Sequence, residues 1–287
     1  MKEDTRPVMV TIRCITYNQE RYIRECLEGF VMQKTNFRFE AIVHDDASTD
    51  STADIIREYE EKYPDIIKPI YETENQYSKH DGSLRRILNE HTHGKYVAVC
   101  EGDDYWTDPQ KLQKQFDFME SHPECSLCFH THNELFPNGV LKECRPATKK
   151  SIYTIEDAII GGGGFMATNS MFYRWELIRN EGKPDFWSNC PIGDFPSMLF
   201  LASKGNFGFF SEVMSVHRAG AIGSWTSGQN SYTKKNRHYK AILDMLDGFD
   251  AYTGYKYHGT ILKKKRKNKV KHIKVFIHSL MNKLFCK

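Results

Sequence analysis

The chain has 287 residues, of which 40% are hydrophobic, 13% aromatic and 27% charged. This balance is typical of a folded globular protein. Because a single core stops growing at about 250–300 residues, we expect one large domain with an appendage, or at most two small domains. No stretch approaches the ~20 apolar residues of a membrane-spanning helix, and eight scattered cysteines indicate reduced thiols, not a disulfide framework.

Two strand–loop–helix units are expected at the start of the chain. The β-branched run 8–15 predicts a buried strand, and apolar residues over 23–31 recur at helical spacing, with Asn18 as the candidate N-cap. The run 39–44 predicts a second strand. The helix after it begins at Ser51, where an acid three residues on resembles a capping box.

Strands and helices alternate beyond this point. Further strands are expected at 66–71, 95–100, 126–132, 169–173 and 207–213. Another helix opens at Asp108-Pro109, with Pro at its first position. Alternation in the first half indicates a mainly parallel sheet with helices on both faces, and we expect the second half to extend this sheet in mixed directions.

Three polar clusters stand at the carboxyl ends of predicted strands: Tyr17-Asn18, Asp45-Asp46 and Glu101-Gly102-Asp103-Asp104. Ligands of such sheets bind beyond these strand ends, so we expect the clusters to meet in one crevice. The last cluster holds three carboxylates, which repel one another and are favoured where a divalent cation such as Mg²⁺ or Mn²⁺ binds. An acidic turn before the next helix is the alternative.

These motifs together resemble the donor-binding half of family-2 glycosyltransferases. The resembling segments are Thr16-Tyr17-Asn18, residues 39–52 and Glu101-Gly102-Asp103-Asp104, and the similarity covers about residues 8–225. It implies an α/β GT-A fold, with a mixed, mainly parallel central sheet flanked by helices. It also predicts a glycosyltransferase domain at residues 1–228 and a helical C-terminal extension at residues 229–287.

The resemblance implies a metal-dependent, inverting transfer of a sugar from a nucleotide-diphosphate donor, expected to be a UDP-sugar. The acceptor would be a hydroxyl of a lipid-linked glycan, in cell-surface polysaccharide biosynthesis. Residues expected to contact the nucleotide are Thr16, Tyr17, Asn18, Glu20, Asp45, Asp46, Ser48, Arg85, Arg86, Glu101, Gly102 and Asp103. Mn²⁺ or Mg²⁺ would be bound by Asp103 and His217. Residues expected at the acceptor are Asp104, Trp106 and Trp225.

This chemistry requires one more carboxylate. The pKa of the attacking hydroxyl lies far above 7, so the hydroxyl needs a general base within hydrogen-bond reach. The resemblance assigns that role to Asp194, which precedes the helix-like run 198–201. A helix cap at Asp194 is the alternative, and the two roles are compatible. For His217, a purely structural role is the alternative.

Two other motifs resemble ligand sites. The glycines 161–164 lack the Lys-Ser or Lys-Thr that a phosphate-binding P-loop requires, so we interpret them as a flexible loop near the acceptor. In the segment 125–132, strand alternation places Cys125 on the face opposite Cys128, and no second ligand pair follows at zinc-site spacing. We therefore expect a strand there and no metal.

The C-terminal segment differs from the rest of the chain. Residues 263–287 carry ten Lys or Arg and no acid, whereas the remaining residues hold 30 basic and 37 acidic groups. Apolar residues recur at helical spacing among these lysines, and a basic amphipathic helix suits an anionic membrane surface. Nucleic acid and a solvated helix are the alternatives; we expect the inner membrane surface and no nucleic acid.

The start of the chain carries charges of both signs and no apolar run before the first strand, so we expect no secretory signal and a cytoplasmic location, peripheral on the membrane. Two other functions stay open from the sequence. A sugar nucleotidyltransferase would need a Gly-rich basic loop where residues 16–20 stand. A non-catalytic scaffold docked on the membrane would bind UDP without turnover.

Overall fold

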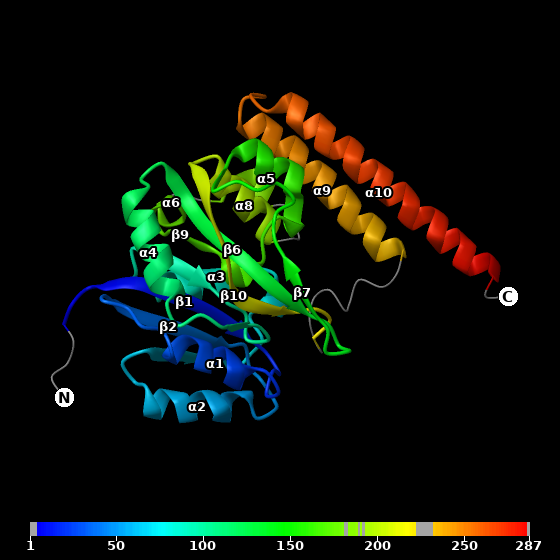
Figure 1. Cartoon of the computed structure of the whole chain (residues 1–287). Coiled ribbons are helices and arrows are strands. Elements are labelled where there is room, and N and C mark those ends of the chain that lie inside the picture. The colour runs from blue at the N-terminus through cyan, green and yellow to red at the C-terminus, as the bar shows by residue number, and fades with distance from the viewer. Residues whose placement is uncertain (1–4, 181–182, 189, 191–192, 222–231, 286–287) are drawn as a thin grey trace.

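The computed structural model describes residues 5–180, 183–188, 190, 193–221 and 232–285, and the side chains of the last helix as far as residue 277. Its first half alternates strands and helices (Figure 1). The strands are β1 (Val8–Thr16), β2 (Arg38–Asp45), β3 (Ile67–Tyr71) and β4 (Tyr96–Val99). Between them lie α1 (Ile23–Val31), α2 (Thr52–Lys62), the 3₁₀ turn η1 (Tyr77–Lys79) and α3 (Ser83–Glu90).

These four strands run parallel in the order β3-β2-β1-β4, as the alternation of elements predicted. Strands β1 and β2 are buried along most of their length because helices cover both faces of the sheet. Thr16 is the register partner of Asp45, so the two strands end side by side. The polar residues that follow each strand therefore start from the same edge.

The second half extends the sheet in mixed directions, as expected. The added strands are β5 (Tyr105–Trp106), β6 (Cys125–Leu135), β9 (Phe172–Arg174) and β10 (Asn206–Arg218), in the order β4-β9-β6-β10-β5. Strand β9 is antiparallel to β4 and β6, whereas β10 is parallel to β6. Two short strands, β7 (Leu141–Cys144) and β8 (Ile152–Tyr153), pair with β6 and β10.

The remaining helices cover the second half. They are α4 (Lys111–Ser121), α5 (Ile155–Gly161), α6 (Glu176–Arg179), α7 (Asp185–Ser188), α8 (Asp194–Ala202), α9 (Tyr232–Tyr252) and α10 (His258–Phe285), with 3₁₀ turns η2 (Gly162–Gly164) and η3 (Thr168–Ser170). A core cluster around Phe129, Phe200 and Phe249 joins β6, α8 and α9. Burying each such ring contributes about 1.5–3 kcal/mol, so this cluster is a main source of cohesion between sheet and helices.

Three local expectations were wrong. Ser51 is the residue before α2, but its side chain makes no cap hydrogen bond, and it is Asp50 that accepts from the amide and hydroxyl of Thr52. Asn18 does not cap α1, which begins after Tyr22. The strand expected at 169–173 begins only at Phe172, because the residues before it form η3.

A capping box does form elsewhere, at the start of α5. The amide of Thr154 donates to Oδ2 of Asp157 at 2.9 Å, and the side chain of Thr154 in return accepts from the amide of Asp157, so two amides of the first turn are satisfied. Strands β5, β7 and β8 were missed because runs of two to four residues carry too little periodicity to read.

The C-terminal residues form a helical hairpin. Helices α9 and α10 lie against each other, α9 also contacts α7, and α10 contacts α5 (Figure 1). The helix expected over residues 263–287 is therefore present as far as Phe285, as part of a longer one that starts at His258, and the last two residues lie outside the described part of the chain. In the described part of the chain, no helix is both long and apolar enough to cross a membrane.

Candidate functional site

The three predicted clusters meet at one edge of the sheet. The amide of Asp46 donates to the carbonyl of Thr16 at 3.0 Å, and the amide of Gly102 donates to the carbonyl of Ile15 at 3.0 Å. The loops after β2 and β4 are thus both fastened to the end of β1. Thr16, at 1% exposure, lies between them.

Gly102 is required by this close approach. A Cβ at this position would lie 2.8 Å from the Cβ and Oγ1 of Thr16 and would overlap the side chain of Gln19. Gln19 is held there because the hydroxyl of Thr16 donates to its Oε1 at 2.8 Å. The glycine therefore lets the acidic loop lie directly on the first loop.

Hydrogen bonds of polar side chains join the loops after β1 and β2. Asn18, with a positive φ of 52°, accepts from the amide of Thr49 at 2.8 Å, and its own amide donates to Ser48 at 2.9 Å. Glu20 accepts from the amide of Ser51 at 3.0 Å. These contacts preorganise the crevice wall, and direct nucleotide contacts of Asn18, Glu20 and Ser48 stay predictions.

The two carboxylates of Asp45 and Asp46 have different surroundings. Asp46 accepts hydrogen bonds from the amides of Gln76 at 2.6 Å and Tyr77 at 3.0 Å. Its carboxylate is therefore used to hold the backbone of the segment that follows β3. Asp45 accepts from the hydroxyl of Ser48, and desolvation raises its pKa. Asp45 is therefore the member of the pair with more capacity left for a ligand.

Three other residues expected at the nucleotide flank this region. Tyr17 is 46% exposed, which leaves its ring free to contact a base. Arg85 is half-buried, with its guanidinium 4.8 Å from the ring centre of Trp187. Arg86 is exposed and pairs with Asp81 at 3.8 Å. The nucleotide roles of all three stay predictions.

Asp104 is the most constrained acid of the site. It is 1% exposed and accepts from the amide of Arg218 at 2.9 Å and from Asn169 Nδ2 at 3.0 Å. Its Oδ2 also lies 3.1 Å from His217 Nδ1, and this hydrogen bond is the main cause that raises the pKa of His217 to about 9. Asp104 thus orients the imidazole, as second carboxylates do for metal-binding histidines.

Asn169 and Arg218 are site residues that the motifs did not single out. Asn169 is fully buried and links the carboxylate of Asp104 to the carbonyl of Val216 at 3.0 Å. Arg218 donates to the carbonyl of Asp103 at 2.5 Å, pairs with Glu25, and lies over the ring of Tyr105. Only the position of Arg218 next to His217 could have indicated it.

The residues around Asp103 suit a hard cation for which the bound substrate supplies most of the ligands. Asp103 is buried, and desolvation followed by the charge of Asp104 raises its pKa, which is the electrostatic situation a cation relieves. Nδ1 of His217 is held by Asp104, so a cation would bind Nε2, in place of the proton that the raised pKa keeps on the ring. Among the described residues no group of three or more His, Cys, Asp or Glu forms a closed cage. Mg²⁺ and Mn²⁺ sites with phosphate ligands need no such cage.

Asp194 is the first residue of α8 and is solvent-exposed. Gly193 occupies the N-cap position, so Asp194 is not the cap of this helix. The pKa of Glu101 is raised to about 8 by desolvation and by the charges of Asp104, Asp103 and Asp194. Glu101 is itself exposed, so repulsion among these acids is the firmer cause. The charge of Asp194 therefore acts on Glu101, although the two residues belong to different halves of the chain.

Of the residues expected at the acceptor, Trp106 is 2% exposed. Its Nε1 donates to the carbonyl of Asn169 at 2.9 Å, and its ring stacks edge-on with Phe30 and under the ammonium of Lys111. These contacts make Trp106 a support for the loop that carries Asp104, and an acceptor contact stays a prediction. Trp225 lies outside the described residues.

A twisted mixed sheet with carboxylates gathered at the ends of its parallel strands defines a GT-A glycosyltransferase fold. The model of the family "Glycosyl transferase family 2" matches residues 11–178, more than half of the chain. The chain therefore belongs to glycosyltransferase family 2, and the resemblance read from the sequence is confirmed.

Relatives of known sequence agree with this membership. An uncharacterised protein of Mycobacterium tuberculosis is 36% identical over 251 residues, covering 83% of this chain and 69% of the relative. The putative teichuronic acid biosynthesis glycosyltransferase TuaG of Bacillus subtilis is 31% identical over 131 residues, covering 46% of this chain and 49% of TuaG.

Solved structures share the fold. TarS of Staphylococcus aureus, residues 1–349 in complex with UDP-GlcNAc, superposes with a TM-score of 0.64 at 18% identity, over 84% of this chain and 66% of TarS 1–349. The mannosyltransferase PcManGT of Pyrobaculum calidifontis, in complex with GDP-Man and Mn²⁺, gives a TM-score of 0.57 at 18% identity, over 84% and 64%. The chain thus spans about two thirds of either solved chain.

Proposed function

We propose that this glycosyltransferase moves a sugar from a UDP-sugar to a hydroxyl of a lipid-linked glycan, with inversion, in cell-surface polysaccharide biosynthesis. The observation that carries the proposal is the meeting of the loops after β1, β2 and β4, with Asp103 and Asp104 buried beside His217. The base would be Asp194, whose charge acts on Glu101 in the acidic loop. The names of TuaG and TarS and the UDP-GlcNAc complex of TarS support the pathway and the donor class.

The donor would bind along the fastened loops. Tyr17 would cover the base, Asp45 would accept hydrogen bonds from the uracil, and Gly102 would let the ribose and diphosphate approach the backbone. Asp103 and His217 would hold a Mn²⁺ or Mg²⁺ ion, which when bound neutralises charge on the departing diphosphate. Asp104 and Asn169 act through His217 by fixing its ring.

Asp194 would take the proton from the acceptor hydroxyl. The oxygen attacks the anomeric carbon from the face opposite the nucleotide, the new C–O bond forms as the bond to the diphosphate breaks, and the configuration inverts. A single displacement needs one base and no covalent intermediate, which agrees with an exposed carboxylate at the start of α8.

The test is UDP release from a panel of UDP-sugars with Mn²⁺ or Mg²⁺, with and without glycan acceptors. Asp194→Asn should lower kcat for transfer by about 10²–10⁴-fold, the contribution of a general base, while UDP affinity stays within twofold. Asp185→Asn is the matched control, since Asp185 is also an exposed acid at the start of a helix. UDP binding without release from any donor would establish the scaffold function instead.

The exposed face of α10 supports a location at the membrane. Val270, Ile273 and Ile277 are 56%, 46% and 49% exposed on a helix rich in lysine. We propose that this face binds the anionic inner surface of the membrane. Ile273→Asp with Ile277→Asp should weaken binding to phosphatidylglycerol vesicles. Unchanged partitioning of this variant at low salt would refute the proposal.

A further inference from the structure

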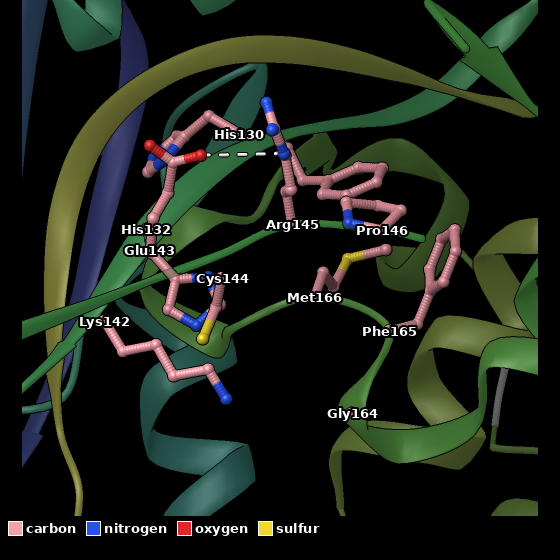
Figure 2. Close-up of a pocket in the computed structure, with 11 residues that line it drawn as sticks. His130, His132, Lys142, Glu143, Cys144, Arg145, Pro146, Gly164, Phe165 and Met166 are labelled. Carbon is pink, nitrogen blue, oxygen red and sulfur yellow. Dashed lines mark ion pairs between the residues drawn. The ribbon is translucent and has the colours of Figure 1, made fainter. Parts of the chain in front are cut away.

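A pocket of about 300 Å³ lies between β6, β7 and the segment 164–166 (Figure 2). It occupies a gap in the sheet. Strand β6 pairs with β9 as far as Cys128 and with β7 only from His132 onward. In the described chain, the edge of β6 between these residues faces the pocket region without a partner strand. The pocket is thus a feature of the sheet itself and does not depend on one loop.

The pocket is adjacent to the candidate catalytic centre. His132 lines it, and the ring of His132 lies 6.5 Å from the ring of His217. The segment that forms the opposite wall, from Gly164 to Met166, continues directly to Asn169, which binds Asp104. A ligand in the pocket would therefore lie beside the residues proposed to act in transfer.

The lining combines aromatic faces with groups that donate and accept hydrogen bonds. The rings of Phe129 and Phe165 lie 5.3 Å apart and form the apolar wall. Arg145 and Glu143 stand on the other side, 3.5 Å from each other (Figure 2). Glu143 pairs with Nε of Arg145, and Lys142 also lines the pocket, so the lining holds both donors and acceptors for the hydroxyls of a sugar.

His130 closes this wall from behind. It is 1% exposed, and its Nδ1 lies 2.8 Å from the carbonyl of Thr131, so Nδ1 carries the proton and donates. Burial holds the pKa of His130 well below its usual range, so the ring is neutral. Its Nε2 is closed off from the surface, so His130 shapes the pocket without binding the ligand through this atom.

We propose that this pocket binds one neutral sugar unit of the glycan acceptor. The volume is at the lower end of the ~300–1,000 Å³ range of small-molecule pockets, which suits a single unit and not an extended oligosaccharide. Phe129 and Phe165 would pack against the ring, and Lys142, Glu143 and Arg145 would bind its hydroxyls. The inference rests on the proposed glycosyltransferase function and names where its acceptor binds.

The test is saturation-transfer NMR on the full chain in the presence of UDP and MgCl₂. The probes are the methyl glycosides of glucose, galactose, mannose and N-acetylglucosamine. Cys144→Trp and Met166→Trp each fill the pocket from a different wall. Leu141→Trp is the matched control, because Leu141 is 54% exposed on the same strand as Cys144 and does not line the pocket.

At least one glycoside should give a signal that persists at saturating UDP and falls at least tenfold in each folded filled variant, with Leu141→Trp unchanged. UDP affinity should stay within twofold in all variants, which separates this inference from the proposed function. The inference is overturned if no glycoside binds while UDP does, if the filled variants bind as wild type does, or if inorganic phosphate displaces the glycoside. Loss of UDP binding by wild type would instead overturn the proposed function.

Discussion

Gly162 and Lys264 form a tight contact between α10 and the catalytic half of the chain. Lys264 is 6% exposed, and its ammonium donates to the carbonyls of Ile160 at 3.1 Å and Gly161 at 3.2 Å. These carbonyls end α5, so the lysine caps that helix from a distant element. A Cβ on Gly162 would overlap Lys264 Nζ and lie 2.9 Å from its Cε.

Gly162→Ala should therefore destabilise the fold by two separable terms. The backbone of Gly162, at φ 74° and ψ −165°, lies in a region essentially restricted to glycine, so an alanine there costs about 1–3 kcal/mol. Displacing the ammonium forfeits two partly buried hydrogen bonds, at about 1 kcal/mol each. Together the free energy of unfolding should fall by about 3–5 kcal/mol.

A double-mutant cycle with Lys264→Ala, followed by urea denaturation, separates these terms. In the Lys264→Ala background the hydrogen bonds are already absent, so Gly162→Ala should cost only the ~1–3 kcal/mol of backbone strain. Gly164→Ala is the control, since no atom lies within 4 Å of its Cβ position and its φ is not positive. An equal cost of Gly162→Ala in both backgrounds would refute the assigned contact.

Three further outcomes are expected. Burial lowers the pKa of Lys111 to about 7, so between pH 7 and 10 the unfolded chain binds the proton that the folded chain has lost. The unfolding free energy of wild type should thus rise relative to Lys111→Met, by up to ~1.4 kcal/mol per pH unit, and a flat difference in urea titrations would contradict this. Asn169→Ala removes bonds to Asp104 and Val216, and should lower stability by about 2–4 kcal/mol in the same assay, whereas a loss under 1 kcal/mol would show that the network is dispensable. Asp104→Asn should raise the Mn²⁺ concentration for half-maximal UDP release by about 10–100-fold, and an unchanged requirement would separate Asp104 from the metal.

The donor half of the site could be predicted because its signals are local. An apolar run followed by Thr16, by Asp45 or by Glu101 marks the end of a strand, and parallel strands end at one edge. The order of these motifs therefore predicted that the three loops lie together at one edge of the sheet. The hydrogen bonds from Asp46 and Gly102 to the end of β1 confirm this.

The caps could not be predicted with the same success. Ser51 and Asn18 are residue types that favour helix caps. In the fold, however, the side chain of Asn18 accepts from Thr49 and the amide of Ser51 donates to Glu20, each across to a neighbouring loop. Such competition is settled by which loops lie side by side, and the residue type alone carries no information about it.

By itself, the sequence determined the alternation of elements, the parallel first half and the acids that stand at its edge. Only the tertiary structure decided that Asn169 binds Asp104, that Arg218 binds the carbonyl of Asp103, and that Lys264 caps the C-terminus of α5. It also decided that a pocket opens along the part of β6 that pairs with neither β9 nor β7. The physical reason is sequence distance. Each of these contacts joins residues that lie tens of positions apart in the chain. Single polar or basic residues make no periodic pattern in the sequence, so nothing there marks them as neighbours in the fold.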